Sequence, residues 1–171
     1  EALDASGTLI KDYPNNSLLY NINGACCAGL GQLEAAVKRY EQALAIKPDY
    51  ADAHNNLGIT LQKLGQMDAA VKSYEQALSI KPDYAEAHSN LGITLKDLGQ
   101  LEAAVKSHEQ ALAIKPDYAK AHSNLGVTLQ ELGQLEEAIK RYEQALAIES
   151  DNITVHYNLG NTLRELGQLE A

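Results

Sequence analysis

The chain has 171 residues, a formal net charge of −9 and 45% hydrophobic residues, with neither Phe nor Trp. Phosphate binding requires clustered Lys and Arg, so this acidic balance disfavours nucleic acid as a partner. No apolar run reaches the roughly 18 residues that a membrane-spanning helix needs, and we expect no membrane partner.

A period of 34 residues organises the whole chain. Residues 51–84 and 85–118 are identical at 26 of 34 aligned positions without a gap. A unit this short cannot bury its own apolar face, so the copies must stack into one continuous core. Stacking predicts one elongated array whose function lies on the surface that the stack creates.

The predicted elements follow this period from the N-terminus. Residues 1–16 are expected to form the second helix of a partial unit, and residues 153–171 the first helix of another. The complete units between them are expected to be helical hairpins, each with a helix A followed by a helix B. They span residues 17–50, 51–84, 85–118 and 119–152.

The unit 51–84 illustrates the local signals. Apolar residues recur at helical spacing, Gly65 supplies a helix stop, and the residue before Pro82 is pushed out of the helical region. Asp83, with Glu86 three residues later, resembles a capping box that would start the next helix. Gly58 lies inside helix A, where glycine costs about 1 kcal/mol against alanine. Because the cost recurs in each unit, we expect a packing reason for it.

These positions carry a family resemblance that covers the whole chain. The unit resembles the tetratricopeptide repeat (TPR) at its phased positions, namely His54, Leu57, Gly58, Leu61, Ala70, Tyr74 and Pro82. The resemblance implies an all-α fold, a right-handed TPR superhelix (α-solenoid) of stacked antiparallel helical hairpins. It also implies that helices A line the concave face.

Four histidines occupy one position in successive units, which raises the question of a metal site. Equivalent atoms in stacked hairpins should lie about 10 Å apart, whereas zinc holds its nitrogen ligands at about 2 Å. We therefore expect structural histidines that replace an aromatic residue, and a packing role for His108 as well. We expect no metal and no cofactor. The four are His54, His88, His122 and His156.

Catalytic motifs are not recognisable in the sequence. We find no nucleophile–base–acid arrangement and no phosphate-cradling glycine loop, so we expect no enzymatic activity within these residues. Cys26 and Cys27 are neighbours in one helix, cannot pair with each other in normal disulfide geometry, and are compatible with a reducing compartment. We expect a cytoplasmic location.

A second phased series is polar and lies beside the core leucines of helix A. Asparagine is a mediocre helix former, so propensity does not explain its repetition. A carboxamide offers donors and an acceptor together, and can pair with both groups of an extended peptide backbone. The series resembles the asparagines in the TPR region of O-GlcNAc transferases, which hold substrate peptide backbone. It comprises Asn56, Asn90, Asn124 and Asn158.

From this series we predict a protein-interaction scaffold that binds an extended peptide or a partner helix in the concave groove. The residues that precede the asparagines are expected to vary side-chain selectivity: Asn55, Ser89, Ser123 and Tyr157. A plainer interpretation is that the asparagines only solvate a polar groove.

Two further alternatives remain open at this point. The array is interpretable as the substrate-recruiting arm of a larger enzyme, such as an O-GlcNAc transferase-like glycosyltransferase. The unmatched half-units at the two ends also suggest head-to-tail assembly into a homo-oligomer, because each end offers the half that the other lacks.

The acidic charge is graded along the array. The formal charge falls from 0 in residues 17–50 to −3 in residues 119–152. A solvated acidic surface is the simplest interpretation, and a preference of the C-terminal side for basic partners is the sharper one.

Overall fold

The structure is a computed structural model that describes residues 2–167, with side chains for residue 6 and residues 8–167. Over these residues it consists of ten helices without a strand, so the all-α prediction is confirmed. The last four residues of the predicted half-unit 153–171 lie outside the described part, as does residue 1. The helices are α1 (Ala2–Asp12), α2 (Ser17–Gly29), α3 (Leu33–Ile46), α4 (Ala51–Lys63), α5 (Met67–Ile80), α6 (Ala85–Asp97), α7 (Leu101–Ile114), α8 (Ala119–Glu131), α9 (Leu135–Ile148) and α10 (Ile153–Glu165).

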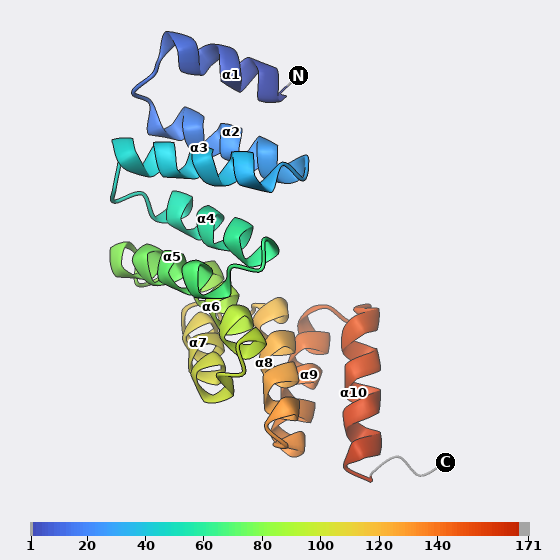
Figure 1. Cartoon of the computed structure of the whole chain (residues 1–171). Helices are drawn as coiled ribbons and strands as arrows, with labels where there is room; N and C mark the ends of the chain where they lie inside the picture. Colours follow the sequence, from blue (N-terminus) through green and yellow to red (C-terminus); the bar gives the residue numbers. More distant parts are fainter. Residues whose placement is uncertain (1, 168–171) are drawn as a thin grey trace. The chain divides into compact units, whose positions relative to one another are not determined.

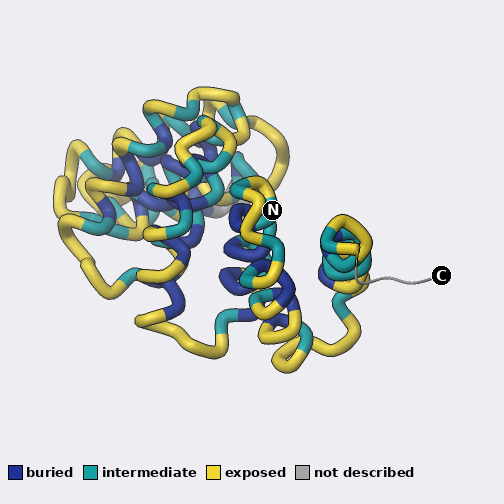
Figure 2. The backbone as a smooth tube through the Cα atoms, turned by 90° about the horizontal axis from the view of Figure 1, so that it is seen from below, coloured by how far each residue is buried: buried dark blue, intermediate teal, exposed yellow. Residues whose placement is uncertain are grey.

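The chain divides into two compact units, Glu1–Asp83 and Tyr84–Ala171. Within each unit, consecutive helices pack against one another as antiparallel neighbours (Figure 1). The buried residues lie along the faces that neighbouring helices turn toward each other, and the outer turns are exposed (Figure 2). Each unit is therefore a stack of helical hairpins, as expected for a solenoid.

The helix A of each complete repeat ends in the same backbone motif. Gly65 has φ of 74°, a conformation that a residue with a Cβ rarely adopts. The amide of Gln66 donates to the carbonyl of Leu61 at 2.9 Å, and the amide of Gly65 donates to that of Gln62 at 2.9 Å. These two bonds form a Schellman motif, which satisfies the last carbonyls of the helix and turns the chain into helix B.

The capping box predicted at Asp83 and Glu86 is wrong. The residue before α6 is Tyr84, and the one before α4 is Tyr50; neither side chain makes a capping hydrogen bond. Asp83 lies one residue too early to cap the helix. In the loop before α4 the tyrosine ring serves a different contact, with the Lys47 ammonium 5.2 Å from the ring centroid of Tyr50.

The core of each hairpin is a contact between the helix A glycine and an aromatic ring of helix B. A Cβ built on Gly58 would lie 2.6 Å from Cε1 of Tyr74, and one on Gly126 would lie 2.6 Å from Cε1 of Tyr142. Both tyrosines are fully buried, and the Tyr142 hydroxyl donates to Oε1 of Gln130 at 3.2 Å. The close approach supplies the packing reason expected for the mid-helix glycines.

The unit 85–118 carries a histidine where the others carry this tyrosine. His108 is 0% exposed and packs against Gly92, and neither of its ring nitrogens has a hydrogen-bond partner. The position that holds Gln62 and Gln130 in the neighbouring repeats is Lys96 here. Burial, together with a smaller contribution from the nearby Lys96 charge, lowers the pKa of His108 to about 4.

The last described helix lacks a covering helix B among the described residues. Gly160 has no atom within 4 Å of a built Cβ, in contrast to the equivalent glycines upstream. Ile153 is 83% exposed and Tyr157 is 68% exposed. The outer face of α10 is thus an apolar helix face without a described partner.

A matched pair of glycine variants tests the ring contact. Gly126→Ala should lower the free energy of unfolding by about 1–3 kcal/mol, because the added methyl group overpacks against Tyr142. Gly160→Ala should raise it by up to about 1 kcal/mol, since the methyl group meets nothing and alanine favours the helix. Urea unfolding of both variants measures this; equal destabilisation by the two would contradict it.

The pH dependence of stability tests His108. Its pKa is lower in the folded chain than in the unfolded chain, so the unfolded state binds the proton first as the pH falls. The contribution of His108 to the free energy of unfolding is complete above pH 6.5, the pKa of histidine in the unfolded chain. Acidification to pH 4 lowers the free energy of unfolding by about 3 kcal/mol through this residue. The double variant His108→Tyr with Lys96→Gln restores the tyrosine and glutamine that the neighbouring repeats carry at these two positions. It should lose this part of the pH dependence. Thermal unfolding at several pH values checks it; parallel profiles of the two proteins would contradict it.

Candidate functional site

The helices A lie on the side of each unit where successive repeats approach most closely. α6 contacts α8 and α8 contacts α10 in one unit, and α2 contacts α4 in the other. Among the described residues of each unit, successive helices B make no comparable contact. The A side is therefore the inner side of each stack, and the B helices diverge on the outer side.

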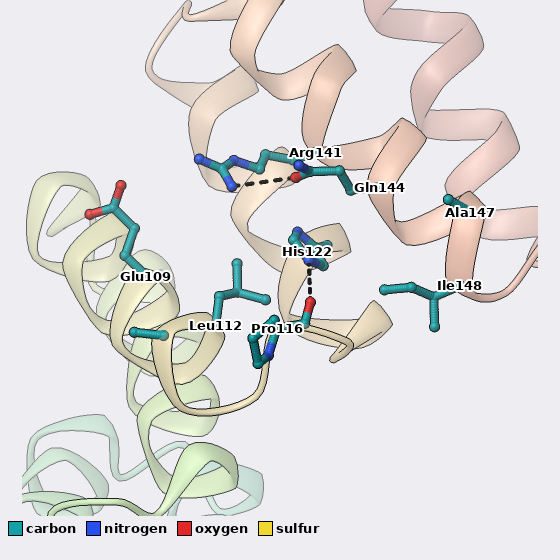
Figure 3. Close-up of a pocket in the computed structure, with 9 residues that line it drawn as sticks. Glu109, Leu112, Pro116, His122, Arg141, Gln144, Ala147 and Ile148 are labelled. Carbon is teal, nitrogen blue, oxygen red and sulfur yellow. Dashed lines mark hydrogen bonds between the residues drawn. The ribbon is translucent and has the colours of Figure 1, made fainter.

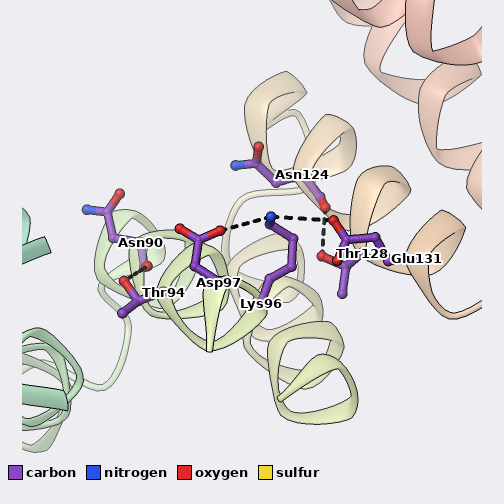
Figure 4. Close-up of polar contacts among 7 residues, drawn as sticks. All are labelled: Asn90, Thr94, Lys96, Asp97, Asn124, Thr128 and Glu131. Atoms are coloured by element: carbon purple, nitrogen blue, oxygen red, sulfur yellow. Dashed lines mark hydrogen bonds and ion pairs between the residues drawn. The ribbon is translucent and has the colours of Figure 1, made fainter. Parts of the chain in front are cut away.

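The four asparagines of the series are on these helices A. Asn56 comes from α4, while Asn90, Asn124 and Asn158 come from the consecutive helices α6, α8 and α10. All four are half-buried, neither sealed in the core nor fully solvated. Figure 4 shows the Asn90 and Asn124 side chains projecting to the same side from α6 and α8.

A buried threonine donates a hydrogen bond to the main-chain carbonyl of each asparagine. Thr128 donates its hydroxyl to the carbonyl of Asn124 at 2.9 Å, four residues earlier, and Thr94 does the same to Asn90 at 3.0 Å (Figure 4). Thr60 and Thr162 repeat this bond at 2.9 Å to Asn56 and Asn158. All four threonine side chains are buried, which indicates a role in helix packing. These bonds engage the main-chain carbonyls of the asparagines and not their carboxamides.

A lysine links two of these helices. The Lys96 ammonium lies 2.9 Å from Asp97 on its own helix α6 and 3.5 Å from Glu131 on α8 (Figure 4). Its hydrogen bond to Asp97 is the main reason that the pKa of Lys96 is raised, against a smaller opposing effect of burial. This ion-pair group ties the C-terminal ends of α6 and α8, beyond the turns that carry Asn90 and Asn124.

Asn56, the asparagine of the series that lies in the unit Glu1–Asp83, is already engaged within the chain. Nδ2 of Asn56 donates to Oδ1 of Asn21 at 3.1 Å, and Nδ2 of Asn21 donates to the Tyr50 hydroxyl at 3.4 Å. Asn21 on α2 occupies the position that holds Ser89 in the repeat 85–118. In this unit a chain of side-chain hydrogen bonds thus links α4 to α2.

Asn124 differs from Asn56 in its bonding. Its Nδ2 is buried and has no hydrogen-bond partner, and the Ser89 hydroxyl at the position equivalent to Asn21 has none either. Ser89 lies near the Tyr118 hydroxyl and moderates the rise in pKa that burial gives that tyrosine, but the two do not meet hydrogen-bond geometry. An unmet buried donor costs about 1–3 kcal/mol, so this carboxamide requires an explanation beyond stability.

The residues that precede the row are placed unevenly. Asn55 and Ser89 are buried, Ser123 is half-buried, and Tyr157 is exposed. Ser123 and Tyr157 therefore lie where a ligand along the A side of their unit would reach them. Asn55 and Ser89 lie within the packing between helices.

The phased histidines have a bonding role that the sequence analysis missed. Nε2 of His54 lies 3.0 Å from the carbonyl oxygen of Pro48, and Nε2 of His122 lies 2.9 Å from that of Pro116. His156 makes the same bond to Ser150 at 2.8 Å. Each ring ties helix A to the loop before it. The signal was present in the sequence as a constant spacing of six residues between each proline position and the following histidine.

The described residues bring no three His, Cys, Asp or Glu side chains together as a metal site would require. None of their helices is long and apolar enough to cross a lipid bilayer.

Alanine substitution along the row tests what each carboxamide does for stability. Asn56→Ala breaks the bond to Asn21, whereas Asn124→Ala removes a donor that has no partner and gains helix propensity. We expect Asn124→Ala to be more stable than Asn56→Ala by about 1 kcal/mol. Urea unfolding midpoints measure the difference; an Asn124→Ala variant that is the less stable of the two would refute it.

Comparison with known proteins places this architecture in a family. Family models described as TPR repeat match residues 27–65 and 128–167, and models described as tetratricopeptide repeat match residues 49–117 and 95–141. A curated relative, the peroxisomal targeting signal receptor of Kluyveromyces lactis, is 35% identical over 60 residues, which are 35% of this chain and only 11% of that protein.

Solved structures give the same result at the level of fold. The MamA protein superposes with a TM-score of 0.80 at 24% identity, over 89% of this chain and 83% of that one. YrrB, described as a TPR protein with an unusual peptide-binding site, gives 0.80 at 21% identity, over 99% and 87%. A chain of the Cut9–Hcn1 structure gives 0.85 at 22% identity, over 94% of this chain and 32% of that one. The chain belongs to the tetratricopeptide repeat family.

Proposed function

We propose that this protein is a cytoplasmic protein-interaction scaffold without catalytic activity of its own, and that it binds an extended peptide along the A side of its helices. The observation that carries the proposal is the row of Asn90, Asn124 and Asn158 on three consecutive A helices of one compact unit. Asn56 continues the same series in the other unit. All four side chains are half-buried at the side where the repeats approach one another.

The spacing of the row suits an extended chain. Packed helices lie about 8–10 Å apart, and an extended peptide advances about 3.3 Å per residue. One carboxamide therefore meets about every third residue of the peptide. Such a peptide presents an N–H and a C=O on alternating edges, and a carboxamide can serve either.

The bonding state of the row supports a ligand role in the unit Tyr84–Ala171. Asn124 has a donor without a partner, while Asn56 has its donor satisfied by Asn21. A peptide carbonyl that reaches Asn124 after a small side-chain rotation would meet that donor. Ser123 and Tyr157 flank the row and would contact peptide side chains, which makes them the determinants of selectivity. Asn55 and Ser89, being buried, would contribute through the shape of the groove.

The comparisons add support of a general kind. YrrB, which shares the fold over nearly the whole chain, is described as having a peptide-binding site. The acidic surface of residues 119–152 favours peptides with basic residues. The exposed apolar face of α10 supports a second candidate, head-to-tail assembly in which a helix of another copy packs against that face.

A peptide library displayed on phage, followed by calorimetry with a selected peptide, tests the proposal. Replacing Asn56, Asn90, Asn124 and Asn158 together by Ala should weaken binding at least about 30-fold, because each lost hydrogen bond contributes about 0.5–1.5 kcal/mol. Circular dichroism should show the helices intact. The same peptide with N-methylated backbone amides should bind more weakly to the unaltered protein, since backbone groups are what the row recognises.

The chain offers a matched control for the four substitutions. Gln42, Gln76, Gln110 and Gln144 form another phased carboxamide series, exposed on the helices B. Replacing Gln42, Gln76 and Gln110 by Ala should leave the affinity unchanged, and Gln144 is kept because it accepts a hydrogen bond from Arg141. Equal loss in this control and in the asparagine variant, or full affinity in the asparagine variant, would refute the role of the row.

A further inference from the structure

A hollow lies on the outer side of the second unit, where the B helices diverge. It has a volume of about 560 Å³ and opens between α7 and α9, above the loop that carries Pro116 (Figure 3). Its apolar walls come from Leu112, Ala113, Pro116, Ala147 and Ile148. Volumes of this size are typical of sites for small ligands or for one or two peptide residues.

His122 forms part of the wall and is only 7% exposed. Its Nε2 lies 2.9 Å from the carbonyl oxygen of Pro116, which can only accept, so Nε2 carries the proton of the neutral ring. Nδ1 is then a lone-pair acceptor. That atom is buried and has no hydrogen-bond partner.

Arg141 on α9 lies on the same wall (Figure 3). One terminal nitrogen donates to Oε1 of Gln144 at 3.4 Å, and the other lies 3.1 Å from Oε1 of Glu137. Its Nε, in contrast, is a buried donor without a partner. Two residues that line the hollow therefore carry an unmet acceptor and an unmet donor, both buried beneath its apolar surface. Each would cost free energy if nothing met it.

We propose that this hollow binds a short peptide segment through one aliphatic side chain and the adjoining peptide group. The peptide N–H donates to Nδ1 of His122, the peptide C=O accepts from Nε of Arg141, and the aliphatic side chain packs between Leu112 and Ile148. Because both polar atoms are buried, the flexible stem of Arg141 shifts when the peptide group enters.

The charges around the hollow favour a neutral or basic ligand over an anion. Glu109 lies on its rim and Glu137 pairs with Arg141, so the guanidinium is not free to attract a carboxylate. The repeat 119–152 has a formal charge of −3. A basic residue next to the aliphatic one would reach Glu109.

Among the complete repeats, only this one combines a histidine with an arginine at these two positions, since the repeat 17–50 has Arg39 but Tyr20 in place of the histidine. The site is also distinct from the asparagine row. The positions equivalent to Arg141 in the two preceding repeats are Ser73 and Ser107, whose hydroxyls donate to carbonyls of their own helices at 3.0 and 3.1 Å. His122 and Asn124 are two residues apart on α8, so their side chains point about 200° apart around the helix. A ligand in the hollow leaves the A side open.

The test uses N-acetyl-leucine N′-methylamide, a leucine side chain between two peptide groups, titrated to about 10 mM and followed by NMR. We expect saturable shifts of the Leu112 and Ile148 methyl groups, of the His122 ring nitrogens and of the Arg141 Nε–H group. An analogue with fully N-methylated amides, which lacks the donor, should bind at least about fivefold more weakly. Absence of saturable shifts, or equal affinity for the two probes, would overturn the proposal.

Two tryptophan variants locate the site. Ala147→Trp fills the hollow from an exposed position and should abolish the shifts. Ala45→Trp places the same ring at the equivalent exposed position of the repeat 17–50, outside the hollow, and should leave them unchanged. The four-asparagine variant should also retain them, so failure here and failure of the peptide groove are separate results. Shifts that persist in Ala147→Trp would show that the probe binds elsewhere.

Discussion

The contact between a helix A glycine and a helix B ring sets the geometry on which the rest depends. At Gly58 and Gly126 the ring of Tyr74 or Tyr142 occupies the space that a Cβ would need, so the two helices of a hairpin approach more closely than ordinary side chains allow. Glycine costs helix stability at that position, and the buried tyrosine offsets it by packing and by a hydrogen bond to a helix A glutamine. Repetition of one geometry gives successive repeats the same orientation.

Both candidate surfaces follow from that orientation. Within each unit the A helices of successive repeats touch and the B helices diverge. The A side brings phased asparagines into a row, and the B side leaves an open hollow between α7 and α9. The repeat thus creates the surfaces, while departures from the repeat distinguish them. Ser89 in place of an asparagine leaves Asn124 without its partner, and Arg141 in place of a serine supplies the donor of the hollow.

The sequence predicted what periodicity and steric rules control. The helices, the Gly65 stop and a packing reason for Gly58 follow from positions that recur every 34 residues. The cap at Asp83 failed because it depended on a helix start within one residue, which tertiary packing decides. The His54 bond to the Pro48 carbonyl was missed because backbone acceptors are invisible in a sequence. The unmet atoms of Asn124, His122 and Arg141 also required coordinates, since they depend on which neighbour reaches which atom.

The histidine that replaces tyrosine in the repeat 85–118 has a consequence for how the array comes apart. In a linear stack each repeat is held only by its neighbours, so stability is a sum of local terms rather than a property of the whole. In the hairpin of α6 and α7 the central ring is His108, and neither of its nitrogens has a hydrogen-bond partner. Burial and the Lys96 charge lower the pKa of this ring, so the folded repeat resists its protonation. Mild acid therefore destabilises this repeat more than its neighbours. Opening would begin at this repeat and leave its neighbours folded, so a protease active at low pH would cut the chain there first.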